Sequence, residues 1–90
     1  MMHEVMTTIP GDDVLRRARD FFAGRVPHFG AFPDQEGPTW ATFRGQGGEE
    51  IAIAVIAEAG GTRVRASSLL FSQTIDRFLS SLPAPGQEAP

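Results

Sequence analysis

The sequence predicts a single α+β domain, a two-layer sandwich in the order β-α-β-β-β(-β)-α with an antiparallel sheet and two helices on one face. Two observations predict it. Apolar residues recur at helical spacing in one segment near each end of the chain, and they alternate along strand-like runs between these segments. Residues 1–83 are expected to form the domain, and residues 84–90, APGQEAP, a flexible polar tail with nothing to bury.

The first predicted elements are a strand over residues 3–9 and a helix after it. Pro10-Gly11 ends the strand, and Asp12 is the expected N-cap because its short side chain can accept a bond from a free backbone N–H. Apolar residues then form one stripe at helical spacing: Val14, Leu15, Ala18, Phe21 and Phe22. The solvated side of the helix is expected to carry three arginines: Arg16, Arg17 and Arg19.

The segment 25–36, RVPHFGAFPDQE, is less regular. Pro27 and Pro33 exclude a central strand, because proline cannot donate a hydrogen bond to a neighbouring strand. We expect an irregular or edge strand around residues 28–32. Two better strands follow at 38–44 and 49–57, and GQGG between them forms a turn. Which of Trp40 and Phe43 faces the helices stays open, because it depends on the register across that turn.

The next turn is predicted at Gly60-Gly61, because glycines supply the positive φ that a two-residue hairpin needs. Taken literally, this turn pairs Ala59 with Thr62, Ala57 with Val64, Val55 with Ala66 and Ile53 with Ser68. It also places Glu58 opposite Arg63 as a cross-strand ion pair.

The two faces of this hairpin differ in the size of their side chains. One predicted face carries Ile51, Ile53, Val55, Ala57, Val64 and Ala66. The other carries Ala52, Ala54, Ile56, Glu58, Arg63, Arg65 and Ser67. The large aliphatic face is expected to meet both helices, and the small-residue face to remain bare.

The segment SQTIDRFLSSLP predicts a closing helix that begins with Ser72 as N-cap and ends before Pro83. Its apolar residues fall at i, i+3, i+4 and i+7: Ile75, Phe78, Leu79 and Leu82.

From about Glu4 to Leu82 this layout resembles the TATA-binding-protein-like and helix-grip folds, the latter including START and polyketide-cyclase-like ligand-binding proteins. The segment TTIPGDDVLRRARD resembles the first strand and helix entry of that group, and TRVRASSLLFSQTIDRFLSSLP a last strand feeding a closing helix. The closing helix here is about three turns long and covers the sheet without walling a cavity. The resemblance therefore implies a fold, and no functional residue is transferred from it.

Composition excludes several classes of function. The chain has no cysteine, hence no disulfide, thiolate nucleophile or cysteine-based metal site. Its formal net charge of -3 argues against nucleic acid as a partner. The longest apolar run, Ile51 to Ala57, is too short to span a membrane, and the first residues do not form a signal peptide. We expect a cytoplasmic protein, either free or peripheral to a membrane complex.

Candidate catalytic groups are few. His28 with Asp34 and Glu36 contains the residue types of a general-base pair or a metal site, but their spacing fits no ligand motif. Trp40 or Phe43 beside Arg44, Arg63 and Arg65 would form an aromatic–basic platform for single-stranded nucleic acid, which the acidic net charge opposes. We therefore expect no enzymatic activity, no cofactor and no metal.

The leading hypothesis is a non-enzymatic interaction module, an adapter or accessory subunit of a larger protein complex. It would dock through its free sheet face, the aromatic 25–36 loop or an edge strand, and small extrinsic subunits of bacterial membrane complexes fit this description. The expected partner-binding residues are Ala52, Ala54, Arg63, Arg65, Phe29 and Phe32. The alternative is a small helix-grip-like protein that binds an apolar ligand in a closed cavity. The sequence also leaves a homo-oligomer open.

Overall fold

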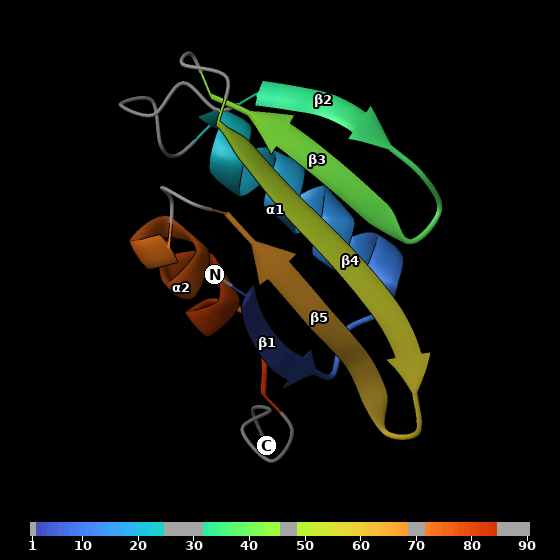
Figure 1. The fold of residues 1–90 in the computed structure, drawn as a ribbon. Coiled ribbons are helices and arrows are strands. Elements are labelled where there is room, and N and C mark those ends of the chain that lie inside the picture. The colour runs from blue at the N-terminus through green and yellow to red at the C-terminus, as the bar shows by residue number, and fades with distance from the viewer. Residues whose placement is uncertain (1, 25–31, 46–48, 69–71, 85–90) are drawn as a thin grey trace.

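The computed structural model describes residues 2–24, 32–45, 49–68 and 72–84, which form one antiparallel sheet and two helices (Figure 1). In chain order the elements are β1 (Met2–Thr7), α1 (Gly11–Gly24), β2 (Phe32–Glu36), β3 (Trp40–Arg44), β4 (Glu50–Glu58), β5 (Gly61–Ser67) and α2 (Ser72–Ser80). The predicted α+β sandwich is confirmed, with four strands between the two helices.

The strand order across the sheet is β1-β5-β4-β3-β2, and each neighbouring pair is antiparallel. The last four strands form a meander, in which each strand pairs with the one that follows it in sequence. Helix α1 carries the chain from β1 at one edge to β2 at the opposite edge, so that β5 returns to pair with β1 (Figure 1). The first and last strands are therefore neighbours.

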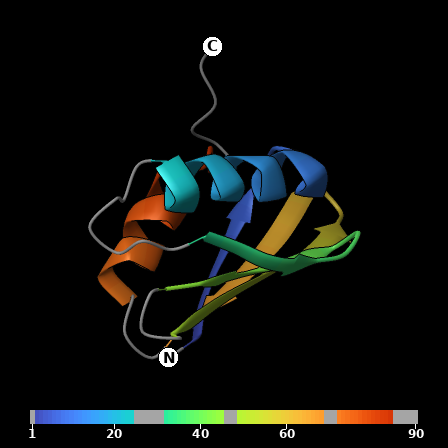
Figure 2. The same cartoon turned by 90° about the horizontal axis from the view of Figure 1, so that it is seen from above.

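Both helices cover the same face of the sheet, and the other face has no second layer among the described residues (Figure 2). A single core cluster fills the space between the layers, and it includes Phe22 from α1, Phe43 from β3 and Phe78 from α2. The ring centroid of Phe22 lies 5.3 Å from that of Phe43 and 5.4 Å from that of Phe78. Aromatic contacts thus join the sheet to both helices.

Helix α1 forms because its apolar stripe matches the helical repeat. Val14, Leu15, Ala18 and Phe22 are buried, and Phe21 packs against the cluster at its edge. The prediction of Asp12 as N-cap is wrong: α1 begins at Gly11 and the N–H of Val14 donates to the carbonyl of Pro10 at 3.1 Å. Because that carbonyl already starts the helical ladder, Asp12 lies in the first turn. Its negative charge still interacts favourably with the positive end of the helix dipole.

The β4–β5 hairpin has a different register from the predicted one. Glu58 pairs with Gly61, Ala57 with Thr62 and Val55 with Val64, so the turn residues are Ala59 and Gly60. Gly60 has a φ of +85°, whereas Gly61 is the first residue of β5. A Cβ at Gly61 would collide with the carbonyl oxygen of Thr7, so this glycine lets β5 approach the end of β1. The register moves by two residues, and every side chain therefore keeps its predicted face.

The two edges of the sheet are closed in different ways. Strand β2 contains Pro33 and an irregularity between Pro33 and Gln35, features typical of an edge strand. It lies further along the chain than the edge strand predicted at 28–32, most of which is outside the described residues. At the other edge, Pro83 accepts from the hydroxyl of Thr7 at 2.6 Å and from the N–H of Thr8 at 3.2 Å. The segment after α2 is thereby tied to the end of β1.

Helix α2 buries Ile75, Phe78 and Leu79. Leu82 is also buried, but it lies beyond the end of α2 at Ser80, so the helix ends two residues earlier than predicted. Across the described segments, neither helix combines the length and the apolar character that crossing a membrane requires.

Candidate docking site on the free sheet face

The side of the sheet that faces away from α1 and α2, here called the free face, carries the large apolar side chains that the described residues expose. These are Met2 on β1, Trp40 on β3 and Ile56 on β4, with 62%, 38% and 43% of their surface exposed. Trp40 and Ile56 each follow or precede a buried residue on their strand, Ala41 beside Trp40 and Val55 beside Ile56. Exposed apolar residues gathered on one face mark an interaction surface more often than scattered ones do.

The sheet register brings Trp40 and Met2 into two adjacent rows, whereas Ile56 lies further along β4, opposite Arg63. In one row, Trp40 faces Ala54, Ala54 faces Arg65 and Arg65 faces Glu4. In the next row, Thr42 faces Ala52, Ala52 faces Ser67 and Ser67 faces Met2. Small side chains therefore occupy the centre of the free face on β4, and large ones stand on both sides of them.

This arrangement produces a groove of about 300 Å³ whose lining includes Met2, Trp40, Ala52, Ala54, Arg65 and Ser67. The alanines leave its floor low because they project only one carbon from the backbone. The question of whether Trp40 or Phe43 faces the helices is thereby answered: Phe43 is fully buried under α1, and Trp40 lines the groove.

Gly37 holds the Trp40 side chain in its place. The N–H of Gly37 donates to the carbonyl of Trp40 at 2.8 Å and closes the β2–β3 turn. A Cβ at position 37 would collide with the indole nitrogen of Trp40, so the ring lies directly against the glycine backbone. The indole is thus supported from beneath and presents its other side to the groove.

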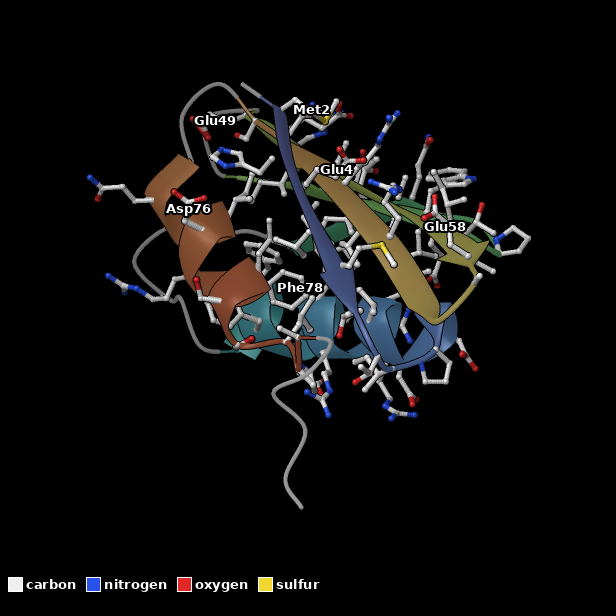
Figure 3. All side chains as sticks on the ribbon, turned by 90° about the horizontal axis from the view of Figure 1, so that it is seen from below. Met2, Glu4, Glu49, Glu58, Asp76 and Phe78 are labelled. Atoms are coloured by element: carbon white, nitrogen blue, oxygen red, sulfur yellow. The ribbon has the colours of Figure 1, made fainter. Side chains whose placement is uncertain are left out.

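A network of ion pairs lies beside the groove on β1, β4 and β5. Arg63 binds Glu58 through two nitrogens, Nε to Oε2 at 2.7 Å and Nη2 to Oε1 at 2.9 Å. Glu4 Oε2 accepts from Arg63 Nη1 at 3.2 Å and from Arg65 Nε at 3.0 Å. Figure 3 shows Glu4 and Glu58 on the side of the sheet away from α1, whereas Phe78 points into the core. The predicted Glu58–Arg63 pair forms, although diagonally, because Gly61 lies opposite Glu58.

The network shifts the pKa values of three of its members, Glu4, Glu58 and Arg63. Hydrogen bonds from Arg65 and then Arg63 lower the pKa of Glu4 below its usual value of 4.5. The pKa of Glu58 is lowered chiefly by its hydrogen bonds from Arg63, and these bonds in turn raise the pKa of Arg63. These shifts favour the charged forms of Glu4, Glu58 and Arg63 at neutral pH.

The carboxylates of the proposed general-base set are engaged elsewhere. Asp34 accepts from Arg44 at 3.2 Å, and Glu36 accepts from Arg19 of α1 at 2.8 Å. His28 lies outside the described residues, as do Phe29 and the side chain of Phe32. Among the described residues, no group of three or more His, Cys, Asp or Glu is arranged to hold a metal ion.

The structure brings together only part of the aromatic–basic platform, because Trp40 and Arg65 both line the groove. Phe43 is in the core, and the three arginines each bind carboxylates: Arg44 binds Asp34 and Glu50, and Arg63 and Arg65 share Glu4. Of Trp40 and Phe43, only Trp40 is exposed on the free face, where a base could stack on it.

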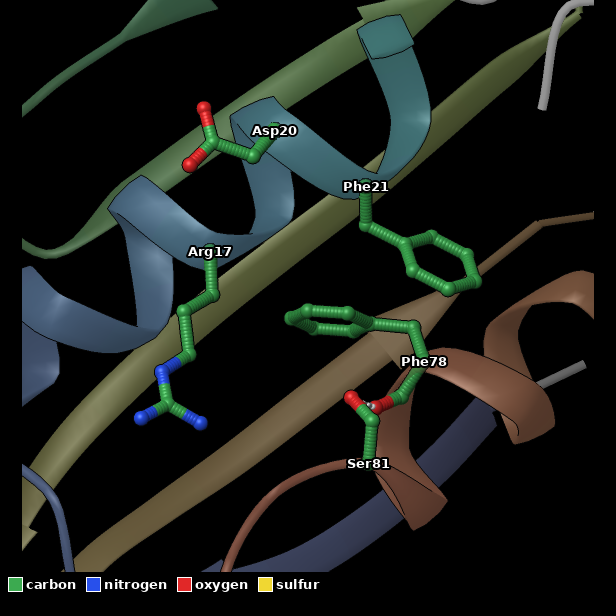
Figure 4. A pocket seen from close by; sticks show the side chains of 5 residues that line it. All are labelled: Arg17, Asp20, Phe21, Phe78 and Ser81. Atoms are coloured by element: carbon green, nitrogen blue, oxygen red, sulfur yellow. Dashed lines mark hydrogen bonds between the residues drawn. The ribbon is translucent and has the colours of Figure 1, made fainter. Parts of the chain in front are cut away.

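A second hollow lies on the helical side, between the end of α1 and α2. It has a volume of about 350 Å³, opens to solvent, and is lined by Arg17, Asp20, Phe21, Phe78 and Ser81 (Figure 4). The rings of Phe21 and Phe78 lie 5.5 Å apart and form its apolar wall. The closed cavity expected for the ligand-binding alternative would lie between sheet and helices, where Phe22 and Phe43 fill the space.

One pair, between a largely buried histidine and an exposed aspartate, was not found by sequence reasoning. His3 on β1 lies on the helical side, and its Nδ1 is 2.8 Å from Asp76 Oδ1 of α2. Its Nε2 is buried and has no hydrogen-bond partner among the described residues. The pair joins the first strand to the last helix, and 73 positions of sequence separate its members, a distance over which no local pattern could indicate contact.

Comparison of the chain with protein-family models, with curated proteins and with solved structures gives no match. The resemblance to TATA-binding-protein-like and helix-grip domains therefore rests on the order of the elements alone.

Proposed function

We propose that this protein is a non-enzymatic interaction module that docks onto a protein partner through the free face of its sheet. The observation that carries the proposal is the exposure of Met2 and Trp40 on either side of a floor of alanines, with Ile56 also exposed further along β4. An exposed aromatic residue beside a low apolar floor has the composition of an interface centre, where tryptophan contributes much of the binding energy.

The charges beside the groove favour the same function. Glu4, Glu58, Arg63 and Arg65 are two negative and two positive groups that pair with one another, so a partner could cover them without leaving a net charge in the interface. A partner of this kind would make the protein an adapter or accessory subunit of a larger assembly. The candidate docking residues are Ala52, Ala54, Arg63 and Arg65, with Trp40 and Met2 added to the set expected from the sequence.

The proposal is tested by recovering the tagged protein from its own host with whatever binds it. Ala54→Glu places a charge on the groove floor, and the partner is expected to be lost. The matched control is Gln73→Glu, which adds the same charge at an exposed position of α2 and is expected to retain the partner. Thermal unfolding of both variants shows that the fold is intact. A partner that survives Ala54→Glu, or a protein recovered alone, would contradict the proposal.

A small apolar ligand is the second candidate function. The specific observation in its favour is the hollow walled by Phe21 and Phe78, whose volume is within the range of ligand sites. Native mass spectrometry of the protein from its host would show a bound small molecule, and Phe21→Ala is expected to release it. A spectrum with the mass of the chain alone contradicts this candidate.

A further inference from the structure

Arg65 is the one charged residue in the lining of the groove, and part of its hydrogen-bonding capacity is unused. Its Nε donates a hydrogen bond to Glu4. Among the described residues, no acceptor is hydrogen-bonded to its two terminal nitrogens, Nη1 and Nη2. The side chain is 53% exposed, so these nitrogens are open to an incoming group. Because a guanidinium presents paired N–H donors in a fixed fork, the group that suits this end of the groove is a carboxylate.

The shape of the groove indicates what carries that carboxylate. The small residues Ala52 and Ala54 run along β4, and the side chains that flank them come from β3 on one side and β5 on the other. The two flanking strands are about 9–10 Å apart, twice the spacing between neighbouring strands. An α-helix with its side chains is about 10–12 Å across, so one apolar side of a helix can rest on the alanine floor between these flanking side chains.

A strand or a second sheet fits the surface less well. Strand addition requires a free edge, and β2 at one edge of the sheet contains Pro33 and a bulge. A flat sheet laid on the free face would meet the side chains of Trp40 on β3 and Arg65 on β5, which stand on opposite sides of the alanine floor. A cylinder can lie between them.

We propose that the groove receives an amphipathic helix of a partner protein, with its apolar side along Ala52 and Ala54 and an acidic side chain on Arg65. The inference rests on the proposed function and adds the chemistry of the partner. Contact with Trp40 supplies an apolar anchor at the β3 side, and the Arg65 fork sets the orientation of the helix at the β5 side.

The charge of the whole chain makes this inference testable. A formal net charge of -3 attracts basic peptides at long range and repels acidic ones. At 0.15 M salt this long-range field is screened beyond about 8 Å, so the local contact with Arg65 decides the preference. The proposal therefore predicts a preference opposite to the one that net charge predicts.

The experiment uses Trp40 as reporter, because it is the single tryptophan of the chain. The titrants are two capped 18-residue helical peptides that lack tryptophan and share one leucine–alanine stripe, flanked by glutamates in one and by lysines in the other. At 0.15 M salt both are expected to shift the emission of Trp40, and the acidic peptide to bind about threefold to tenfold more tightly. This range corresponds to one exposed, charge-assisted contact.

Variants assign the preference to Arg65. Arg65→Gln is expected to abolish the difference between the two peptides. The matched control Arg16→Gln removes an exposed arginine of α1, which pairs with Asp13, and is expected to retain the difference. Equal affinities for wild type, or tighter binding of the lysine peptide, overturn the choice of an acidic partner.

Two further outcomes overturn the helix itself: no change in Trp40 emission with either peptide, or a concentration-dependent emission shift with dimers in sedimentation of the protein alone. The second outcome would mean that another copy of the chain covers the groove. Each leaves the proposed function standing if a partner still co-purifies and is lost on Ala54→Glu. Loss of that co-purification result would instead overturn the proposed function.

Discussion

The two faces of β4 are both apolar, and they differ in size and in what covers them. Ile51, Ile53 and Val55 are almost fully buried beneath α1, whereas Ala52 and Ala54 are half-buried with no layer above them in the described structure. A strand exposed to water normally alternates apolar with polar residues. On this strand the two faces therefore differ in side-chain size rather than in polarity. The large side chains pack against the helices, and the alanines leave the other face without a covering layer in the described structure.

Charge separates the faces as well. The helical side buries an aromatic cluster, and the free face carries the Glu4, Glu58, Arg63 and Arg65 network beside its apolar groove. These exposed ion pairs contribute little to stability, because water screens them and side-chain entropy opposes them. Under the proposed function, these residues would contribute to recognition of the partner.

The largest predicted effect comes from removing one aromatic residue from each face of β3. Phe43→Ala is expected to lower the free energy of unfolding by about 3–5 kcal/mol, because it leaves a cavity against Phe22 in a filled core. Trp40→Ala is expected to cost only about 1–2 kcal/mol, because its ring is partly in water already. Urea unfolding of both variants measures the difference.

The same two variants are expected to reverse their order when partner binding is measured. Trp40→Ala removes the anchor of the groove, whereas any Phe43→Ala molecule that remains folded keeps the free face unchanged. Equal losses of stability for the two variants would mean that the sheet has a second buried face, and the comparison would fail.

Features of the fold could be predicted from the sequence where they depend on residues close together in the chain, and not where they depend on distant ones. The faces of β4 and β5 were predicted because alternation with a period of two depends only on neighbouring residues. The register was wrong by two residues, since Gly61 is explained by the Thr7 carbonyl on β1, a contact that the hairpin sequence does not contain. The helical stripes were local patterns too, and their buried residues were predicted correctly.

The groove shows where prediction from sequence ended. Ala52, Ala54 and Arg65 were identified, but Met2 and Trp40 were not, because their place depends on β1 pairing with β5 and on the β2–β3 turn. The role of Glu4 in joining Arg63 to Arg65 depends on the same pairing. Met2 and Glu4 belong to contacts between segments far apart in sequence, whereas the place of Trp40 depends on a local turn against Gly37.

A smaller effect is expected from adding atoms to the two faces. A Cβ at Gly11, where α1 begins, would lie 2.7 Å from Val55 Cγ2 and 3.3 Å from Val55 Cβ. Gly11→Ala should therefore push α1 away from β4 and cost about 1–2 kcal/mol, after a gain in helix propensity of about 0.5–1 kcal/mol.

The matched change on the free face is Ala54→Val, which meets no covering layer and is expected to alter stability by less than about 0.5 kcal/mol. Thermal melts of the two variants compare the faces directly. If Ala54→Val lowers the stability as much as Gly11→Ala does, the groove is already occupied, for example by a second copy of the chain.

The smallest predicted effect concerns the ion pairs of the free face and their dependence on pH. The pKa of Glu58 is lowered by hydrogen bonds from Arg63, so the pair stabilises the folded state above pH 4.5 and loses this contribution as pH falls through the lowered value. Glu58→Gln removes the contribution at every pH. The melting temperatures of wild type and variant should therefore differ slightly at pH 7 and converge below pH 4.5. The difference at pH 7 should also shrink in 1 M salt, because the pair is exposed. A melting-temperature difference that stays constant down to pH 3 would mean that Glu58 stabilises the fold through packing. The free face would then be stabilised in part by packing contacts, as the core is.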